Sequence, residues 1–302
     1  MRVRRECAAV RFAGREPVFA TAPERASGWL LVEHPGPWPP VGPPHGVPPD
    51  FWAAAGEAGL RTLCIRPVRR RRSSPVTVFA AGPAGGWLER AVIGDLRELA
   101  GLDLEALAAG RPPGFGTRGA GKVVLVCTHG RRDVCCARLG RPLAERLDER
   151  LPGLVWEATH VGGHRYAANV VTVPDGRFHG GLTAADAAEF AAAVRDGRVL
   201  TGFLRGRAGL RVPVQAAEHF TRVRFGLSGV DDVIPVGDEV LGDDGAVRVR
   251  LSLADGSPCT VDVRPRPLGK VRPASCAGAV TAPRTFDLLA LRGGAPGGQR
   301  AG

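Results

Sequence analysis

The chain has 302 residues, of which 44% are hydrophobic and 24% are charged. This composition is typical of a globular protein and excludes a disordered or fibrous one, and the length predicts two or three domains. The formal net charge of +11 favours acidic partners. However, the basic run 69–72 lacks the interleaved aromatic residues of a single-strand binding platform, so we expect no nucleic acid partner.

Membrane and secretion signals are not apparent in the sequence. No apolar stretch reaches the roughly 18 residues that span a bilayer, and the basic N-terminus is not followed by the apolar region of a signal peptide. We therefore expect a soluble, cytoplasmic protein without a membrane partner. The seven cysteines are odd in number and include the adjacent pair Cys135 and Cys136, which argues against a secreted disulfide framework and indicates metal or redox chemistry.

Residues 1–112 are predicted to form an α/β half. Hydrophobic runs predict strands at 29–32, 62–67 and 75–80, and helical spacing predicts helices at 51–59 and 88–109. Residues 110–121 contain two prolines and five glycines, which makes them the best candidate for a domain linker.

Residues 113–205 are predicted to form a thioredoxin-like domain. The prediction rests on the order β-α-β-loop-β-β-α over about 85 residues. The predicted elements are strands at 122–126, 154–158, 170–173 and 177–179 and helices at 136–150 and 183–196.

Residues 206–302 are predicted to be a small β-rich accessory unit with a helix near 214–224 and a β-hairpin of 246–253 and 260–263. A weak internal echo links the first two regions, since 30–36 resembles 124–130 and 76–78 resembles 171–173. One interpretation is that residues 1–112 are a degenerate copy that cannot hold the same cofactor, because Glu33 stands where the second region has Cys127. The alternative is that the matches are fortuitous.

Four residues form the candidate metal site. Eight residues separate Cys127 from Cys136, and three, two of them glycines, separate His160 from His164. Thiolates and imidazoles are ligands for zinc, copper and iron–sulfur centres. Each pair follows a strand of a parallel β-α-β unit, so both loops should emerge at the same edge of the sheet. Any one of these residues alone would be interpreted as a core residue, but four within 38 positions favour a metal.

The spacing also bears on which metal is bound. Structural zinc sites usually have shorter cysteine knuckles, so the wide gap between the cysteines favours two irons. The stretches 127–136 (CTHGRRDVCC) and 156–166 (WEATHVGGHRY) closely resemble the sucrase/ferredoxin-like family. The resemblance covers about 122–195 and extends to 29–38. It implies a thioredoxin-like ferredoxin with a [2Fe-2S] cluster, as in characterised eukaryotic members.

By this resemblance, Cys127 and Cys136 bind one iron, and His160 and His164 bind the other. Cys135 is the alternative to Cys136. Replacing two thiolates with neutral imidazoles removes negative charge, so we expect a relatively high potential. Rieske centres lie at roughly −150 to +300 mV, against about −400 mV for plant-type clusters. Because coordinated imidazoles titrate, the potential should also depend on pH.

Several neighbours of these ligands are candidates for supporting roles. Arg131, Arg132 and Arg165 would dock an acidic redox partner, such as a flavoprotein reductase, or are solvated loop charges. His129 is a candidate donor to a cluster sulfur, and Asp133 is the candidate cap of the following helix.

The four cysteines outside the motif are expected to be structural: Cys7, Cys64, Cys259 and Cys276.

The sequence thus predicts an electron carrier or redox sensor rather than an enzyme with its own substrate. The first alternative is a zinc-stabilised interaction module. The second is a thiol-disulfide oxidoreductase using Cys135 and Cys136, although the thioredoxin motif has two residues between its cysteines. No carboxylate pair is placed for glycoside hydrolysis.

Overall fold

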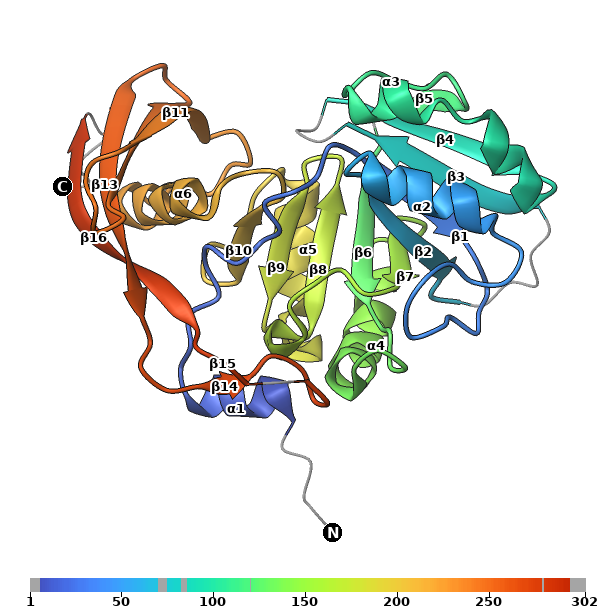
Figure 1. Ribbon diagram of the computed structural model, residues 1–302, viewed down its shortest axis with the longest axis horizontal. Coiled ribbons are helices and arrows are strands. Elements are labelled where there is room, and N and C mark those ends of the chain that lie inside the picture. The colour runs from blue at the N-terminus through green and yellow to red at the C-terminus, as the bar shows by residue number, and fades with distance from the viewer. Residues whose placement is uncertain (1–5, 70–74, 83–85, 120, 279, 294–302) are drawn as a thin grey trace, which may run out of the picture.

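A mixed sheet of ten strands runs through most of the chain (Figure 1). The computed structural model describes residues 6–69, 75–82, 86–119, 121–278 and 280–293. The predicted mixed α/β class is confirmed. Of the basic run 69–72, only Arg69 lies within the described residues. The strands are β1 (Trp29–Glu33), β2 (Arg61–Pro67), β3 (Val76–Ala81), β4 (Leu88–Ile93), β5 (Thr117–Gly119), β6 (Val123–Cys127), β7 (Val155–Ala158), β8 (Asn169–Val173), β9 (Arg177–Gly180) and β10 (Leu204–Arg207).

The sheet contains two sets of four strands with the same connectivity, in the spatial order β10-β9-β8-β6-β7-β2-β1-β3-β4-β5. In one set, β6 is parallel to β7 and antiparallel to β8, which pairs with β9; strands β1 to β4 pair in the same way. A helix links each parallel pair, α2 (Pro49–Glu57) in the first half and α4 (Val134–Asp148) in the second. The halves join where β2 pairs antiparallel with β7.

The strand register tests the internal echo of the sequence. Glu33 and Cys127 are each the last residue of their strand, as that echo requires. The match of 76–78 with 171–173 is wrong, because the strand pairing displaces it by three residues. Leu31 pairs with Phe79 and Leu125 pairs with Val171, so Phe79 takes the place of Val171. An odd shift matters because it moves every side chain to the other face of the sheet.

The central strands of the second half are buried on both faces, which explains their continuous apolar sequences. On one face, Val124 and Val170 pack with apolar residues of α4 and of α5 (Ala187–Arg195). On the other face, Leu125 and Val171 pack with Trp29 of the first half. The short 3-10 helix η3 (Ala184–Asp186) leads into α5 behind a Thr183 capping box. The predicted element order of this half is therefore present.

Two predictions for the first half are wrong. The segment 88–109 is not one helix but β4 followed by the 3-10 helix η1 (Leu96–Gly101) and by α3 (Leu104–Ala108). The helix prediction fails because β4 pairs along its whole length with β3, and a capping box of Asp95 and Glu98 starts η1. The segment 110–121 is also more than a linker, since it contributes β5, which pairs with β4.

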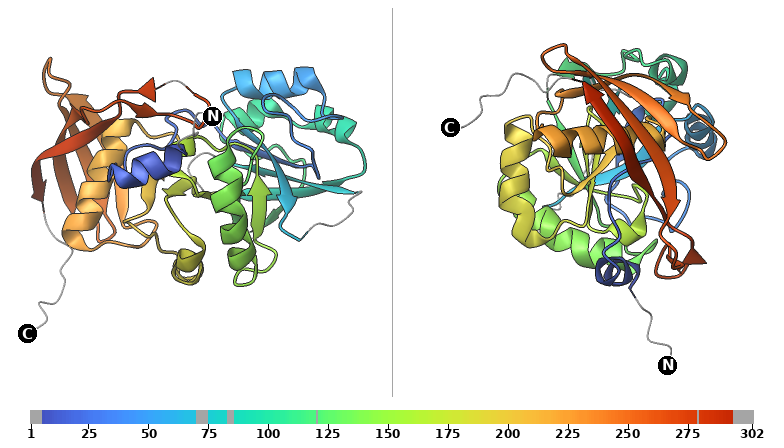
Figure 2. Two further views of the ribbon diagram at one scale, coloured as in Figure 1. Left: turned by 90° about the horizontal axis from the view of Figure 1, so that it is seen from below. Right: turned by 90° about the vertical axis from the view of Figure 1, so that its left-hand side faces the viewer.

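The C-terminal region packs α6 (Val212–Phe225) against an antiparallel sheet, as Figure 2 shows. The predicted helix and hairpin are present, but the two outer strands were not predicted. The sheet contains β11 (Val233–Val240), β12 (Val247–Leu253), β13 (Pro258–Pro267) and β16 (Arg284–Gly293). Among the described residues, none of the helices has the length and apolar character needed to cross a bilayer.

The N-terminal helix and a hairpin of the C-terminal region lie against the second half of the large sheet. The N-terminal helix α1 (Cys7–Ala13) packs against the 3-10 helix η2 (His164–Tyr166) and against β14 (Arg272–Pro273). Strand β14 pairs with β15 (Val280–Thr281) in a two-stranded hairpin that extends from the C-terminal sheet. Figure 1 shows α1 and this hairpin side by side. These contacts bring residues from the two ends of the sequence close to α4.

Candidate metal centre

The four predicted ligands lie together at the ends of β6 and β7. The sulfur atoms of Cys127 and Cys136 and one ring nitrogen of His160 lie within 4.8 Å of one another. The Cys136 sulfur is 3.7 Å from Nδ1 of His164. The two imidazoles stack, with ring centroids 3.8 Å apart. Two thiols and two imidazoles from separate loops therefore face one another.

The first turn of α4 positions the adjacent cysteines. Asp133 caps the helix, as predicted, and its Oδ1 accepts a hydrogen bond from the Cys135 backbone N–H at 2.9 Å. The two sulfur atoms then diverge. Cys136 faces Cys127, whereas the Cys135 sulfur lies 3.2 Å from that of Cys276. This placement favours Cys136 as the partner of Cys127.

Gly140 allows α4 to approach the end of β6 closely. A Cβ atom at this position would lie 2.2 Å from the backbone oxygen of Cys127. Any other residue would therefore push the helix and the strand apart. The closeness of α4 and β6 in turn keeps Cys136 near Cys127.

The histidine loop is fixed through three consecutive backbone carbonyls, each of which accepts a hydrogen bond from a buried or half-buried side chain. The pairs are Arg61 Nη2 with the Val161 oxygen (2.7 Å), Arg205 Nη1 with the Gly162 oxygen (2.9 Å) and Asn169 Nδ2 with the Gly163 oxygen (2.9 Å). Gly162 and Gly163 have φ values of 103° and 74°, which favour glycine. Sequence reasoning missed the three donors because no motif marks an isolated polar residue in a strand.

The first half of the sheet also contacts both ligand loops. The Thr159 N–H donates to the Cys64 oxygen at 2.8 Å, and the Cys64 N–H donates to the Thr159 hydroxyl at 3.0 Å. Trp38 meets His129 edge-on, with ring centroids 5.9 Å apart. The strand ends of the second half are therefore supported from across the sheet.

The electrostatics favour the ligand forms of two of these side chains. A hydrogen bond with the Cys136 thiol lowers the pKa of Cys127 well below its ordinary value, against the effect of burial and with further help from His160. The same hydrogen bond raises the pKa of Cys136. Burial, with the neighbouring charge of His160, lowers the pKa of His164 to about 4. These shifts favour the thiolate of Cys127 and the neutral imidazole of His164, the forms that bind metals.

The site contains polar atoms without partners. Nδ1 of His160 and both ring nitrogens of His129 are buried and have no hydrogen-bond partner among the described residues. Such atoms are rare in native proteins and require an explanation. One ring nitrogen of His160 lies within 4.8 Å of both thiols, so a bound metal centre would give that nitrogen a partner. The donor set of two thiols and two imidazoles fits zinc or an iron–sulfur cluster.

The three predicted docking arginines are placed differently. Arg131 and Arg132 are exposed beside the cysteine loop. Arg165 is half-buried, with its Nε 2.8 Å from a carboxylate oxygen of Glu16 and its Nη1 2.9 Å from the Thr281 hydroxyl. Arg165 thus links both ends of the chain to the histidine segment, which leaves Arg131 and Arg132 as the exposed positive charges.

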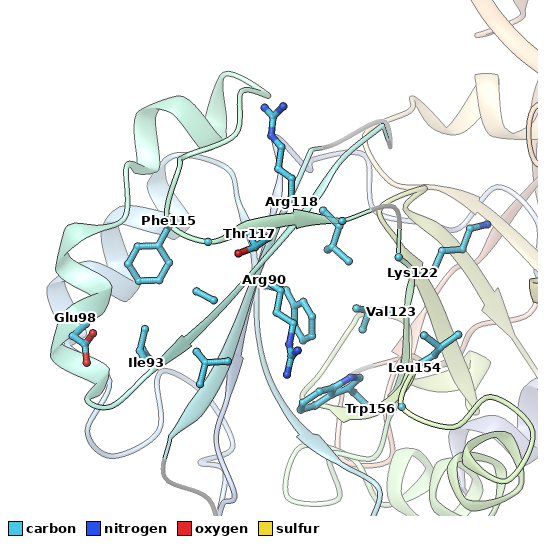
Figure 3. Close-up of a pocket in the computed structure, with 18 residues that line it drawn as sticks. Arg90, Ile93, Glu98, Phe115, Thr117, Arg118, Lys122, Val123, Leu154 and Trp156 are labelled. Atoms are coloured by element: carbon cyan, nitrogen blue, oxygen red, sulfur yellow. The ribbon is translucent and has the colours of Figure 1, made fainter.

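A small cavity of about 220 Å³ borders the candidate centre and is lined in part by Trp38, His129, Arg132 and His160. A larger one of about 900 Å³ lies elsewhere (Figure 3). Its lining includes Val123 at the start of β6, whereas the candidate ligands follow the strand ends. The larger cavity therefore lies apart from the four candidate ligands, whereas the smaller one gives access to His160.

Comparison with known proteins agrees with the predicted family. Residues 75–206 match the model of the sucrase/ferredoxin-like family, which covers the second half and strands β3 and β4 of the first. A yeast protein, altered inheritance of mitochondria protein 32 of Meyerozyma guilliermondii, is 42% identical over 60 residues. The matched stretch is 18% of this chain and 21% of the yeast protein, so the chain spans about a fifth of that relative's length. No solved structure matches the chain.

Proposed function

We propose that this chain, whose residues 75–206 match the sucrase/ferredoxin-like family, holds a [2Fe-2S] cluster and carries single electrons. The observation that carries the proposal is the convergence of two cysteines and two histidines at one sheet edge within the matched region. By the family resemblance, Cys127 and Cys136 would hold one iron, and His160 and His164 the other. The cluster would supply one-electron redox chemistry.

The surrounding residues suit this role. Cys127 is fully buried, and Trp38, which is 4% exposed, packs beside the ligand loops, so water is largely excluded from the cysteine side of the site. Two neutral imidazoles add no negative charge, which favours a potential above that of a four-thiolate site. His160 lies on the small cavity, where its ring can exchange protons with solvent.

Proton uptake at the histidine side should accompany reduction. A ligand imidazole beside a less positive metal would hold its outer proton more tightly, so the reduced state would bind this proton at a higher pH than the oxidised state does. The midpoint potential should therefore fall as pH rises, by up to about 59 mV per pH unit for one proton per electron. A potential that stays flat from about pH 6 to about pH 10 would contradict this part of the proposal.

An acidic redox partner, such as a flavoprotein reductase, is proposed for the exposed face near Arg131 and Arg132, with electron transfer in the cytoplasm. The net charge of +11 supports steering of such a partner. Replacing both arginines with glutamate should slow reduction by the partner and weaken its salt dependence, without changing the visible spectrum. An unchanged rate in this variant would exclude the surface as the docking site.

One observation favours a second candidate, a zinc-stabilised module. The ligand atoms of Cys127, Cys136 and His160 lie within 4.8 Å of one another, a spacing that suits a single tetrahedral ion. Two irons would require the histidine loop to lie farther from the cysteines. The two candidates differ in colour and in metal content, so one measurement separates them.

The test is the visible spectrum, together with iron and acid-labile sulfide content, of anaerobically purified protein beside a His164→Cys variant. Two irons and two sulfides per chain, with absorption that shifts in the variant, are expected. A colourless protein that binds zinc here, even after reconstitution with iron and sulfide, would overturn the electron-transfer proposal in favour of the zinc module.

A further inference from the structure

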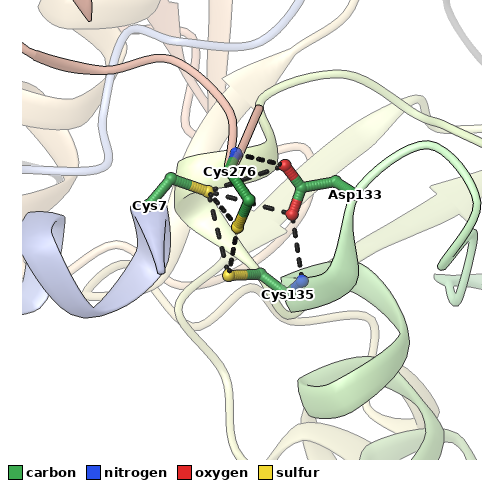
Figure 4. A group of neighbouring side chains, drawn as sticks. All are labelled: Cys7, Asp133, Cys135 and Cys276. Atoms are coloured by element: carbon green, nitrogen blue, oxygen red, sulfur yellow. Dashed lines mark hydrogen bonds between the residues drawn. The ribbon is translucent and has the colours of Figure 1, made fainter. Parts of the chain in front are cut away.

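A second group of cysteines meets at the start of α4, next to the candidate cluster site, and Figure 4 shows its side chains. Cys7 comes from α1, Cys135 from α4, and Cys276 from the segment between β14 and β15. The Cys7 sulfur lies 3.8 Å from that of Cys135 and 3.6 Å from that of Cys276. The Cys135 and Cys276 sulfurs are 3.2 Å apart. Residues up to 269 positions apart in sequence therefore converge at one point.

Asp133 completes this group as a fourth donor. Its Oδ2 lies 3.8 Å from the Cys7 sulfur. The carboxylate already accepts the backbone N–H groups of Cys135 at 2.9 Å and Cys276 at 2.8 Å. Since a carboxylate has about four acceptor sites, these two bonds leave lone pairs free.

The separations fit one tetrahedral ion. Zinc–sulfur bonds of about 2.3 Å place two sulfur ligands roughly 3.8 Å apart, and a carboxylate oxygen roughly 3.5 Å from a sulfur. The sulfurs of Cys7, Cys135 and Cys276 are 3.2 to 3.8 Å apart, and Asp133 lies 3.8 Å from Cys7. A multi-iron cluster would hold its protein ligands farther apart than this.

Charge provides a second, independent argument. The Asp133 side chain has no exposed surface, and the only ion pair recorded for it among the described residues is with His164, at 3.9 Å. That distance is too long for a hydrogen bond, and His164 belongs to the candidate cluster site. A buried carboxylate without a cation is costly. A divalent ion bound by Asp133 and the three thiolates would offset part of this negative charge.

We propose that Cys7, Cys135, Cys276 and Asp133 bind one zinc ion, separate from the redox centre. Thiolates select zinc over magnesium and calcium, and three sulfurs with one oxygen leave no open position on a tetrahedral ion, as in a structural site. The ion fastens α1 and the β14–β15 hairpin to the capped end of α4. Glu16 reinforces this junction through ion pairs with Arg165 at 2.8 Å and Arg272 at 3.0 Å.

A disulfide between Cys135 and Cys276 is the competing use of these thiols. Such a bond measures about 2.05 Å and would leave the Cys7 thiol and the Asp133 carboxylate facing an uncharged bridge. Metal binding uses all four groups, which is why the structure favours it.

Metal content of the full chain tests the proposal. The protein is purified anaerobically with a reductant, equilibrated with Zn²⁺ and passed through a desalting column. Iron and zinc are then measured separately for wild type and for the variants Cys7→Ser, Cys276→Ser and Cys259→Ser. Cys259 is a matched control for Cys7 because it is equally buried but lies in the C-terminal sheet.

The expected result is one zinc per chain in wild type and in Cys259→Ser, and at least a tenfold loss of zinc in the other two variants. Their iron content and visible spectrum should not change, which separates this proposal from the proposed function. Zinc retained in Cys7→Ser and Cys276→Ser would overturn it. So would wild type that binds no zinc outside the candidate cluster site, or a disulfide between Cys135 and Cys276 under these conditions.

Cobalt provides a measurement that does not depend on the folding of the cysteine variants. In a His160→Ala/His164→Ala variant the candidate cluster site loses two ligands, while the Cys7 group stays intact. One Co²⁺ per chain should bind with the ligand-field bands and thiolate charge-transfer absorption of a tetrahedral sulfur-rich site. A pale octahedral spectrum, or no binding, would contradict the proposal.

Discussion

The two halves of the large sheet have the same connectivity but differ where their first strands end. In the second half, β6 ends in Cys127, which faces the other candidate metal ligands. In the first half, β1 ends in Glu33, whose carboxylate accepts the Thr77 backbone N–H at 2.8 Å. One strand end is satisfied within its own sheet, and the other presents a thiol to a second loop. The shared framework alone therefore does not make a metal centre; the residues at the strand ends do.

The first half has a supporting role instead. Arg61 holds the Val161 carbonyl, Cys64 pairs with Thr159, and Trp38 packs against His129. All three contacts reach loops of the second half. The first half thus supports the loops of the second half that carry the candidate ligands. Substitutions at equivalent positions of the two halves can test this difference.

The largest effect is expected at the two strand ends. Cys127→Ala should abolish metal binding at the candidate centre, because it removes a buried ligand there, whereas zinc at the Cys7 group should stay. Glu33→Gln at the equivalent position should retain metal, because the amide oxygen can still accept from Thr77. Iron and zinc analysis of both variants tests this, and equal loss in the two would remove the distinction between the halves.

The helices provide the next comparison. Gly140→Ala in α4 places a Cβ 2.2 Å from the Cys127 oxygen, so it should destabilise the protein by about 1–3 kcal/mol and reduce metal content. Gly56 lies in α2 with no atom within 4 Å of the corresponding Cβ. Gly56→Ala should therefore stabilise by about 0.4–1 kcal/mol.

Urea unfolding of both glycine variants measures these changes. If Gly140→Ala were as stable as Gly56→Ala and kept its metal, the close approach of α4 to β6 would not be what positions Cys136.

Acid sensitivity should also differ between the halves. Burial, with the nearby charges of Arg177 and Arg222, lowers the pKa of His179 to about 3. The register puts Ala91 at the same position in the first half. Since the unfolded chain binds this proton near pH 6.5, His179 should lower stability as pH falls from about 6.5 towards 3, by about 1.4 kcal/mol per pH unit.

A His179→Leu variant removes this titratable side chain. Between pH 7 and pH 5 it should lose about 2 kcal/mol less stability than wild type, as measured by urea unfolding at each pH. Parallel curves for the two proteins would show that His179 does not titrate on unfolding in this range.

The smallest effect is expected at Arg61, which supports the histidine loop from the first half. Arg61→Met removes the hydrogen bond to the Val161 carbonyl and should cost about 1 kcal/mol, because relief of the buried guanidinium offsets part of the loss. Burial already lowers the pKa of Arg61, which shows that its charge is held at a cost. Amide exchange at residues 160–164 should become faster in this variant, and unchanged exchange would mean that Arg205 and Asn169 hold the loop without it.

Periodicity and turn signals in the sequence predicted most of the second half. Continuous apolar runs identified β6 and β8, and Asp133 was recognised as the cap of α4. The segment 88–109 was misjudged because its strand becomes apparent only through pairing with β3. Outer strands β11 and β16 were missed for the same reason, since pairing with distant segments defines them.

The candidate centre could be predicted because its ligands lie within one β-α-β unit. The Cys7 group could not, because Cys7 and Cys276 come from opposite ends of the chain and no local spacing relates them. Their common neighbour Cys135 was the visible clue, as a cysteine left over beside a better-placed one. Two adjacent cysteines at a helix start point in different directions, so each can belong to a different site.

The position of Cys276 also sets an order of assembly during synthesis. The ribosome completes residues 127–164 well before it reaches Cys276, so the candidate centre has all its proposed ligands while the Cys7 group still lacks one. Cofactor insertion can therefore precede closure of the second site. The hairpin that carries Cys276 would then dock beside His164 as a late step, after the neighbouring centre is filled.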